Sequence, residues 1–322
     1  MDYEFNIFTE EEFPAAMKEV EEKLTARRKG GEFPSFDGLS VHYEYYLVEK
    51  PRGCLVMVHG FTEFSKKYYE LCWYFLNQGY HVFLHDLRGH GLSGRQVENL
   101  SLAHVDCYED YVEDLKQFMQ QIVRPAAGEL PVYLFGHSMG GAIVTLYLME
   151  EGKDISKAVL SSPMVVPVTP LPPKFLVRYT AKMAKKEGWS ARFPHASNFN
   201  PNPSFERSAD ASESRFRRHI ELRLSDKRYQ NSSSTNSWMY HTLQVDRKLL
   251  DKEKLAKVKT KILLLQAGKD KVVLLKPQNK LAKRLPHCRM ELFPEAKHTI
   301  FNAGQAVLHR YVALVLEFLE EG

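Results

Sequence analysis

Residues 131–147 read Pro-Val-Tyr-Leu-Phe-Gly-His-Ser-Met-Gly-Gly-Ala-Ile-Val-Thr-Leu-Tyr. The first five residues form a short apolar run, which is typical of a strand buried on both faces, and the run from Ala142 onward favours a helix. Between them lies Gly136-His137-Ser138-Met139-Gly140, which has the form G-x-S-x-G. Glycines at positions 136 and 140 leave room for crowded backbone, so that the serine can project its hydroxyl from a strained turn. The stretch therefore predicts Ser138 as a nucleophile between a strand and a helix.

Apolar strand patterns alternate with helical patterns along most of the chain. This alternation is typical of a mostly parallel sheet with crossover helices on both faces. The predicted strands are residues 42–48, 54–58, 82–84, 132–135, 158–160, 262–265 and 290–293, of which the first alternates like an edge strand. The predicted helices are residues 68–77, 108–123, 139–150, 277–284 and 305–319. A serine turn of this form on such a sheet predicts the α/β-hydrolase fold.

The composition changes between residues 163 and 245. This segment opens with five prolines and then carries 13 Lys or Arg against 6 Asp or Glu, whereas the whole chain has a net charge of only +4. A segment of different composition between two strands favours an insertion rather than part of the sheet. We predict a helical cap, or lid, at residues 163–245 over a core domain formed by residues 1–162 and 246–322.

A serine hydroxyl needs a base, and the base needs an acid that fixes its orientation. In α/β-hydrolases these residues follow the serine in the order Asp or Glu, then His. Asp270 lies in the loop after the strand at 262–265, and His298 lies in the loop after the strand that ends at residue 293. His287 precedes that last strand and His309 falls within a helix, so both are poorer candidates. We predict a catalytic triad of Ser138, Asp270 and His298.

Attack on a carbonyl creates an oxyanion, which needs two well-placed hydrogen-bond donors. One predicted donor is the backbone N–H of Met139, directly after the nucleophile. The second is the backbone N–H of Phe61, in the sequence His59-Gly60-Phe61 after the strand at 54–58. For His59 itself we favour a packing role over contact with substrate.

These motifs together resemble the lysophospholipase and monoacylglycerol lipase group of α/β-hydrolases, and within it the bacterial lysophospholipases of the L2 type. The resemblance runs from about residue 35 to the end of the chain, and it implies monoacyl lipid substrates and a lid. It rests first on residues 59–61, followed by Glu63, Ser65, Lys67-Tyr68 and Glu70-Leu71. It rests further on residues 86–95, 110–115, 136–141 and 264–273, and on the segment around His298.

The loop Asp86-Leu87-Arg88-Gly89-His90-Gly91-Leu92-Ser93 is also shared with this group. We interpret it as structural, with Asp86 and Arg88 bonded to neighbouring loops and the glycines supplying unusual backbone angles. Phosphate binding by Arg88 is the alternative.

Two basic segments of the cap suggest contacts with anions. Residues 173–186 place Lys174, Arg178, Lys182 and Lys186 on one helical stripe and Phe175, Leu176, Tyr179 and Met183 on another. Such a helix either contacts an anionic membrane surface or presents a solvated lysine face over a cap core. A second group could steer a phosphate-bearing substrate: Arg215, Arg217, Arg218, Arg223, Lys227 and Arg228. No nucleic-acid-binding motif accompanies the charge, so nucleic acid is not an expected partner.

The composition, with 44% apolar and 26% charged residues, is that of a globular protein. The acidic start Met1-Asp2-Tyr3-Glu4 and the lack of a span of roughly 20 apolar residues predict a cytoplasmic protein, with membrane association left open. Histidine and cysteine spacings match no metal motif, and we expect neither metal nor cofactor.

The sequence thus predicts a serine hydrolase that releases a fatty acid from a monoacyl lipid through an acyl-enzyme intermediate. One alternative keeps the same triad for a short-chain carboxylic ester, a small peptide or an amide. A ligand-binding protein on a hydrolase scaffold is disfavoured, because all three triad residues are present.

Overall fold

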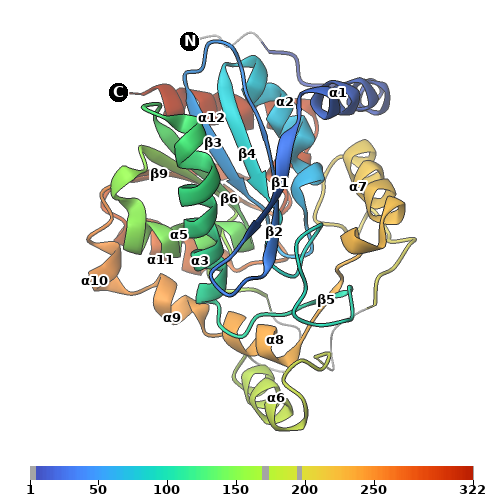
Figure 1. Cartoon of the computed structure of the whole chain (residues 1–322), viewed down its shortest axis with the longest axis vertical. Helices are drawn as coiled ribbons and strands as arrows, with labels where there is room; N and C mark the ends of the chain where they lie inside the picture. The colour runs from blue at the N-terminus through green and yellow to red at the C-terminus, as the bar shows by residue number, and fades with distance from the viewer. Residues whose placement is uncertain (1–4, 169–173, 194–197, 322) are drawn as a thin grey trace.

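A computed structural model describes residues 5–168, 174–193 and 198–321, and of residues 174 and 185–187 only the backbone. In this part of the chain eight strands form one sheet in the order β1-β2-β4-β3-β6-β7-β9-β10 (Figure 1). Strand β2 pairs antiparallel with β1 and β4, and all other neighbours are parallel. The strands are Lys29–Pro34 (β1), Ser40–Tyr46 (β2), Gly53–Val58 (β3), Tyr80–His85 (β4), Val132–His137 (β6), Lys157–Ser161 (β7), Lys261–Ala267 (β9) and Cys288–Phe293 (β10).

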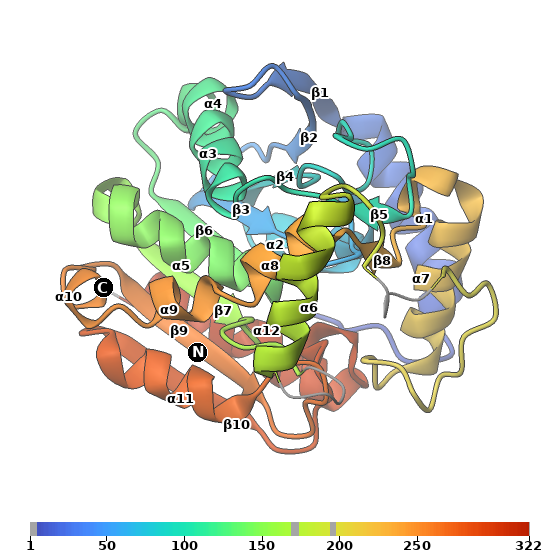
Figure 2. The same cartoon turned by 90° about the horizontal axis from the view of Figure 1, so that it is seen from below.

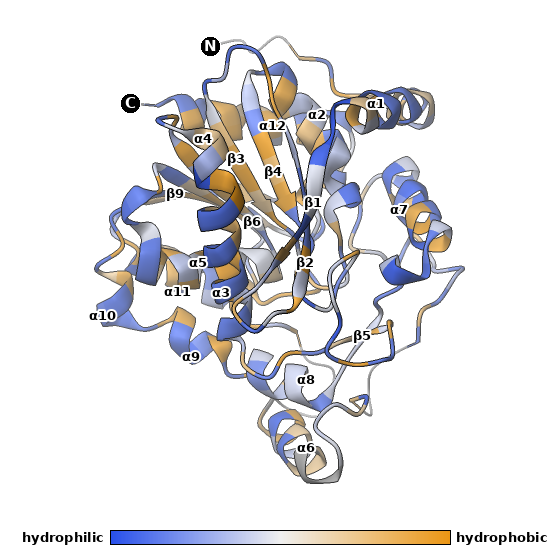
Figure 3. Cartoon of the chain, viewed as in Figure 1, coloured by the Kyte–Doolittle hydropathy of each residue, from blue (hydrophilic) through white to orange (hydrophobic). Residues whose placement is uncertain are grey.

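Helices cover both faces of the sheet (Figures 1 and 2). One face packs against α3 (Glu109–Phe118), α5 (Met139–Glu151), α9 (Val245–Leu249), α10 (Lys252–Leu255) and α11 (Leu275–Arg284). The other packs against α1 (Phe13–Arg27), α2 (Tyr69–Asn77) and α12 (Gln305–Glu320). Because side chains alternate along a strand, Val56 and Val58 of β3 enter the first core while Leu55 and Met57 enter the second. Both faces of the central strands are therefore apolar, as their colour in Figure 3 shows.

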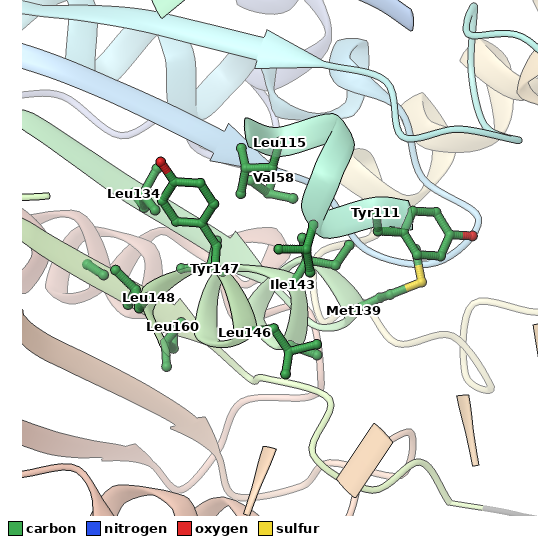
Figure 4. Close-up of a cluster of buried hydrophobic side chains, with 14 of the residues drawn as sticks. Val58, Tyr111, Leu115, Leu134, Met139, Ile143, Leu146, Tyr147, Leu148 and Leu160 are labelled. Carbon is green, nitrogen blue, oxygen red and sulfur yellow. The ribbon is translucent and has the colours of Figure 1, made fainter. Parts of the chain in front are cut away.

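Helix α5 carries the nucleophile turn at its N-terminus and is buried on nearly every side. Figure 4 shows Met139, Ile143 and Tyr147 of α5 packed among side chains of β3, β6, β7 and α3. This all-round burial fixes the helix against the sheet and so fixes the start of the helix, where Ser138 lies.

Two parts of the fold differ from the sequence prediction. Helix α1 and strand β1 were not predicted. Strand β1 pairs with β2, so the strand predicted at 42–48 is not an edge strand of the sheet. The helix predicted at 108–123 is α-helical only as far as Phe118. A π-helical turn at Met119–Val123 and the short helix Arg124–Ala127 (α4) follow it without a break. Short 3-10 turns occur at Ser65–Tyr68, Gly152–Asp154, Lys227–Tyr229 and Ile300–Asn302.

The predicted cap lies between β7 and β9. It contains the helices Lys174–Glu187 (α6), Glu213–Ser225 (α7) and Asn236–Thr242 (α8). Its two-residue strand Ser233–Ser234 (β8) pairs parallel with Leu102–Ala103 (β5) of the core. In both cartoons α7 lies apart from α6 and α8 (Figures 1 and 2). No helix within the described residues has both the length and the apolar character that crossing a bilayer requires.

Candidate active site

Ser138 lies at the turn between β6 and α5. Its φ of +51° falls in the left-handed region, which a residue with a side chain adopts only at an energetic cost. A Cβ at Gly136 would lie 2.6 Å from the carbonyl oxygen of Gly140, and a Cβ at Gly140 would lie 2.1 Å from that of Val58. Only glycine fits at these two positions, because the opposing atoms belong to the backbone.

Backbone hydrogen bonds hold the strained turn in place. The N–H of Ser138 donates to the carbonyl oxygen of Ser161 at 3.0 Å, and the carbonyl oxygen of Ser138 accepts from the N–H of Met164 at 2.8 Å. Both partners lie on β7 or directly after it. The sheet and the first residues of the cap segment therefore share the support of the turn.

The structure brings Asp270 and His298 together from two loops. Nδ1 of His298 lies 2.7 Å from Oδ2 of Asp270, and neither side chain exposes more than 6% of its surface. The other oxygen, Oδ1, accepts from the backbone N–H groups of Val272 and Val273 at 2.8 and 3.0 Å. Burial raises the pKa of Asp270, but the hydrogen bond and charge of His298 and the two amides outweigh it, so the pKa lies below its ordinary value. The carboxylate therefore stays ionised at neutral pH.

An ionised carboxylate at Nδ1 makes that nitrogen the donor, which leaves Nε2 of His298 as the proton acceptor. Ser138 and His298 line the same pocket, and the ring of His298 lies 5.0 Å from that of His137, the neighbour of Ser138 in sequence. Burial lowers the pKa of His137 to about 3, so it is neutral and does not compete as a base. His287 precedes β10 and His309 lies in α12, and neither lines the pocket.

The loop after β3 also comes close to Ser138. A Cβ on Gly60 would lie 3.2 Å from Cβ of Ser138, which measures how close the loop comes. The N–H of Gly60 is already used, because it donates to Oε2 of Glu63 at 2.7 Å. Within the described residues the N–H groups of Phe61 and Met139 bond to no protein acceptor. They are therefore available to a ligand beside Ser138.

His59 supports this loop rather than reaching the pocket. Its Nε2 accepts from the N–H of Leu87 at 2.9 Å, so its proton lies on Nδ1, which donates to the carbonyl oxygen of Gly60 at 2.8 Å. The packing role expected for His59 agrees with these two bonds.

The loop at residues 86–93 is also structural. Arg88 is fully buried and donates to both oxygens of Asp114 at 2.7 Å, and its Nη1 lies 2.9 Å from Asp37. Asp86 accepts from the N–H and hydroxyl of Ser65, and a Cβ at Gly91 would lie 2.0 Å from its Oδ2. Arg88 does not line the pocket, so phosphate binding by Arg88, the alternative role, is wrong.

The pocket has a volume of about 800 Å³ and is bounded by both core and cap. Part of its wall is apolar, and the ring of Trp238 from α8 stacks on that of Phe61 at 4.2 Å. Other apolar lining residues include Met164, Pro167, Val168, Phe199, Phe216, Ile220 and Val272. In the described part of the chain no cluster of three or more His, Cys, Asp or Glu is arranged to hold a metal ion.

Glu63 and Lys67 also line the pocket, although the sequence had assigned them no role. Burial alone would raise the pKa of Glu63, but Lys67 at 2.6 Å, together with His137 and Tyr68, holds it well below its ordinary value. Its Oε2 also accepts from the N–H of Gly60. The carboxylate thus fixes the loop that carries Phe61. The spacing of four between Glu63 and Lys67, typical of a helical ion pair, was the available signal.

Comparison with known proteins finds similar lipid hydrolases. Lysophospholipase L2 of Escherichia coli (strain K12) is 28% identical over 252 residues, which cover 77% of this chain and 72% of that protein. Monoglyceride lipase of Homo sapiens is 36% identical over 116 residues, which cover 36% of each chain. The resemblance to lysophospholipases and monoacylglycerol lipases is thereby confirmed.

Solved structures confirm the α/β-hydrolase fold. A soluble variant of monoglyceride lipase from Saccharomyces cerevisiae, in complex with a substrate analog, superimposes with a TM-score of 0.73 at 21% identity and covers 91% of this chain and 94% of that one. A carboxyl esterase from Bacillus coagulans gives a TM-score of 0.72 over 91% of this chain and 97% of that one, also at 21% identity. The family described as serine aminopeptidase, S33, matches residues 49–305. Because this match spans most of the chain, the protein belongs to that family of serine hydrolases.

Proposed function

We propose that this protein hydrolyses the ester bond of a monoacyl lipid, a lysophospholipid or a monoacylglycerol, with Ser138, His298 and Asp270 as its triad. The observation that carries the proposal is the 2.7 Å bond between Asp270 and His298 at a pocket that Ser138 also lines. The names of the relatives favour such a lipid, and the apolar part of the pocket provides room for an acyl chain.

In the proposed mechanism Nε2 of His298 takes the proton of the Ser138 hydroxyl as its oxygen attacks the acyl carbonyl. The N–H groups of Phe61 and Met139 receive the negative charge on the carbonyl oxygen, an interaction worth about 3 kcal/mol for each donor. His298 then gives its proton to the leaving alcohol, and an acyl group remains on Ser138. Water, deprotonated by His298, releases the fatty acid and restores the hydroxyl.

The family description raises the alternative of a peptide substrate. An aminopeptidase needs an anionic group for the terminal ammonium of its substrate. The two pocket carboxylates, Glu63 and Asp210, both interact with Lys67, and Asp210 also accepts from Asn302 at 3.0 Å. Both carboxylates are therefore already engaged by donors of the protein, which favours the ester over the peptide.

We also propose that helix α6 of the cap contacts an anionic membrane. Among its described side chains, Val177 and Ala181 are buried and pack against Leu243, whereas the predicted apolar stripe of α6 is exposed. The exposed members are Phe175, Leu176, Tyr179 and Met183, and the exposed Lys182 lies among them. The stripe therefore does not form a cap core, and it supplies the apolar face that interfacial binding requires.

The enzymatic proposal is tested with a fluorophosphonate probe and a substrate panel. We expect the probe to label the wild type and not Ser138→Ala, and we expect monoacyl lipids to be hydrolysed faster than short nitrophenyl esters or aminoacyl amides. Labelling that persists in Ser138→Ala would remove the nucleophile assignment. Labelling of Ser138 with turnover of short esters or amides alone would remove the lipid assignment.

A further inference from the structure

Besides the exposed Arg207, three basic side chains outside the predicted triad and its neighbour His137 line the pocket. Lys67 comes from the 3-10 turn Ser65–Tyr68, and His219 and Arg223 come from α7 and line the same cavity. The two residues of α7 are four positions apart, so they lie on one face of the helix. Burial lowers the pKa of His219 well below its ordinary value, and the charges of Lys67 and Arg223 lower it further. The three side chains are therefore close neighbours.

Among the six basic residues that the sequence grouped together between 215 and 228, Arg223 has a distinct environment. Arg215 pairs with Glu70, Arg217 with Glu213, Arg218 with Glu21 and Glu221, and Arg228 with Asp226. Lys227 is exposed and does not line the pocket. Within the described residues Arg223 has no carboxylate within ion-pair distance. Of these six basic residues, Arg223 is therefore the one that lines the pocket without a carboxylate partner among the described residues.

The guanidinium of Arg223 is nevertheless held in a defined position. Its Nε donates to the carbonyl oxygen of Tyr229 at 3.2 Å, its Nη2 donates to that of Asn231, and the group lies 4.6 Å from the ring centre of Phe199. Burial lowers the pKa of Arg223 to about 10, so the group is charged at neutral pH. Two carbonyl oxygens and an aromatic ring do not supply the counter-charge that a buried cation needs, and an anionic ligand would supply it.

His219 supplies a second donor of matching character. Its Nε2 is buried and has no hydrogen-bond partner among the described residues. Since its pKa is low, the ring is neutral at pH 7 and can donate one N–H without adding charge. Lys67 lies nearby, but Glu63 and Asp210 offset much of its charge.

We infer that Arg223 and His219, beside Lys67, form a subsite for the phosphodiester of a monoacyl glycerophospholipid. This inference rests on the proposed function and deepens it. Phe61 and Trp238 would contact the acyl chain, while His219 and Arg223 of α7 would contact the phosphate. An arginine is suited to a phosphate because its planar group donates two parallel hydrogen bonds.

The subsite is tested by the ratio of kcat/KM for a lysophospholipid to kcat/KM for the monoacylglycerol of the same acyl chain. We expect Arg223→Gln to lower this ratio about 10- to 100-fold, as the loss of charged hydrogen bonds would, through a raised KM for the phospholipid. Arg223→Lys should recover part of the ratio, and His219→Leu should lower it by roughly threefold to tenfold. Arg217→Gln, on the exposed face of the same helix, is the matched control and should keep the wild-type ratio.

Two results would overturn the inference. One is wild-type kcat/KM on both lipids in Arg223→Gln, and the other is an equal loss of kcat/KM on both lipids in a variant with wild-type thermal stability, which would mean a structural role. A wild type that hydrolyses neither lipid, although its Ser138 reacts with the probe, would refute the proposed function instead.

A separate assay tests the subsite without a lipid substrate. We expect sn-glycerol 3-phosphate to inhibit turnover of a short nitrophenyl ester competitively, and Arg223→Gln to weaken that inhibition. Equal inhibition by inorganic phosphate would show a site for free phosphate rather than for a lipid headgroup, and no inhibition by either compound would contradict the subsite.

Discussion

At the scale of single residues, the bond between Asp270 and His298 determines which imidazole nitrogen can act as a base. Replacing Asp270 by Asn removes the charge that holds the proton on Nδ1. We expect kcat to fall by about 10⁴ with a small change in KM, as in other triads. The matched control is Asp154→Asn, an acid at the opposite end of the adjacent strand. Steady-state kinetics with wild-type kcat in Asp270→Asn would assign the acid role to another residue.

At Gly140 the absence of a side chain is required by the local fold. A methyl group there would lie 2.1 Å from the carbonyl oxygen of Val58 and 2.6 Å from that of His59. We expect Gly140→Ala to destabilise the protein by about 3 kcal/mol or more in chemical denaturation, because only backbone could move aside. Gly304→Ala is the control, since a Cβ there meets no atom within 4 Å. Equal stability of the two variants would contradict the crowding.

The carboxyl group of Glu44 should make the free energy of unfolding depend on pH. It is buried in β2, and burial, with the charge of Asp86, raises its pKa from the ordinary 4.5 to about 7. The folded chain then holds the proton more tightly than the unfolded chain does. The resulting stabilisation is complete below pH 4.5 and is lost as the pH rises through 7, by about 3 kcal/mol.

Glu44→Gln should remove this dependence. Relative to the wild type, the variant should gain free energy of unfolding at pH 8.5 and gain little at pH 5, measured by denaturant titration at both values. Tyr69 donates to Glu44 at 3.0 Å and can equally donate to the amide oxygen of Gln. A wild-type pH profile in Glu44→Gln would show that another group is responsible.

At the scale of elements, helix α7 is anchored to the N-terminal part of the chain. Arg215 of α7 is buried against Glu70 of α2, with bonds of 2.6 and 2.9 Å, and also donates to the carbonyl oxygen of Phe8 at 3.1 Å. Arg218 adds a pair with Glu21 of α1. These contacts join α7 to α1 and α2, and α6 lies apart from α7 (Figures 1 and 2).

Breaking the buried ion pair between Arg215 and Glu70 should destabilise the protein. Arg215→Met leaves the Glu70 carboxylate without its cation, and we expect a loss of about 3–5 kcal/mol in the free energy of unfolding. Arg217→Met, which removes an exposed pair with Glu213, should change stability by less than about 1 kcal/mol. Equal effects in a denaturation series would contradict the anchoring role.

The sequence predicted those elements whose structure depends on residues that are neighbours in the chain. Strand β6, the turn and α5 follow from neighbouring residues, and so do the loops that carry Asp270 and His298. Helix α1 had a readable signal, since its buried residues Phe13, Met17, Val20 and Leu24 recur at helical spacing. The buried side of α6 could not be predicted, because Leu243 and the partner helix α8 select it from a distance.

The cationic part of the pocket shows the same limit. The sequence grouped Arg223 with five other basic residues of similar spacing. Its separate character depends on which of them meet a carboxylate, and the partners Glu21 and Glu70 are far away in sequence. Such pairings require the assembled fold.

At the scale of the whole molecule, charge and exposed apolar surface both concentrate in the cap. The cap carries 13 Lys or Arg against 6 Asp or Glu, and Phe175 and Tyr179 of α6 are 69% and 60% exposed. If this side meets a membrane, Phe175→Asp with Tyr179→Asp should weaken sedimentation with vesicles rich in phosphatidylglycerol roughly tenfold. Leu292→Asp, at an exposed apolar side chain of the core, should have no effect. Unchanged binding of the double variant would exclude α6 as the contact.

The stacking of Trp238 on Phe61 restricts how this molecule can be re-engineered. The first residue belongs to the insertion, and the second carries a backbone amide proposed to stabilise the transition state. Grafting a foreign lid to alter selectivity would therefore also disturb turnover, unless the graft brings an aromatic ring to the same place. Screening of chimaeras should retain that ring and vary the remainder of the lid.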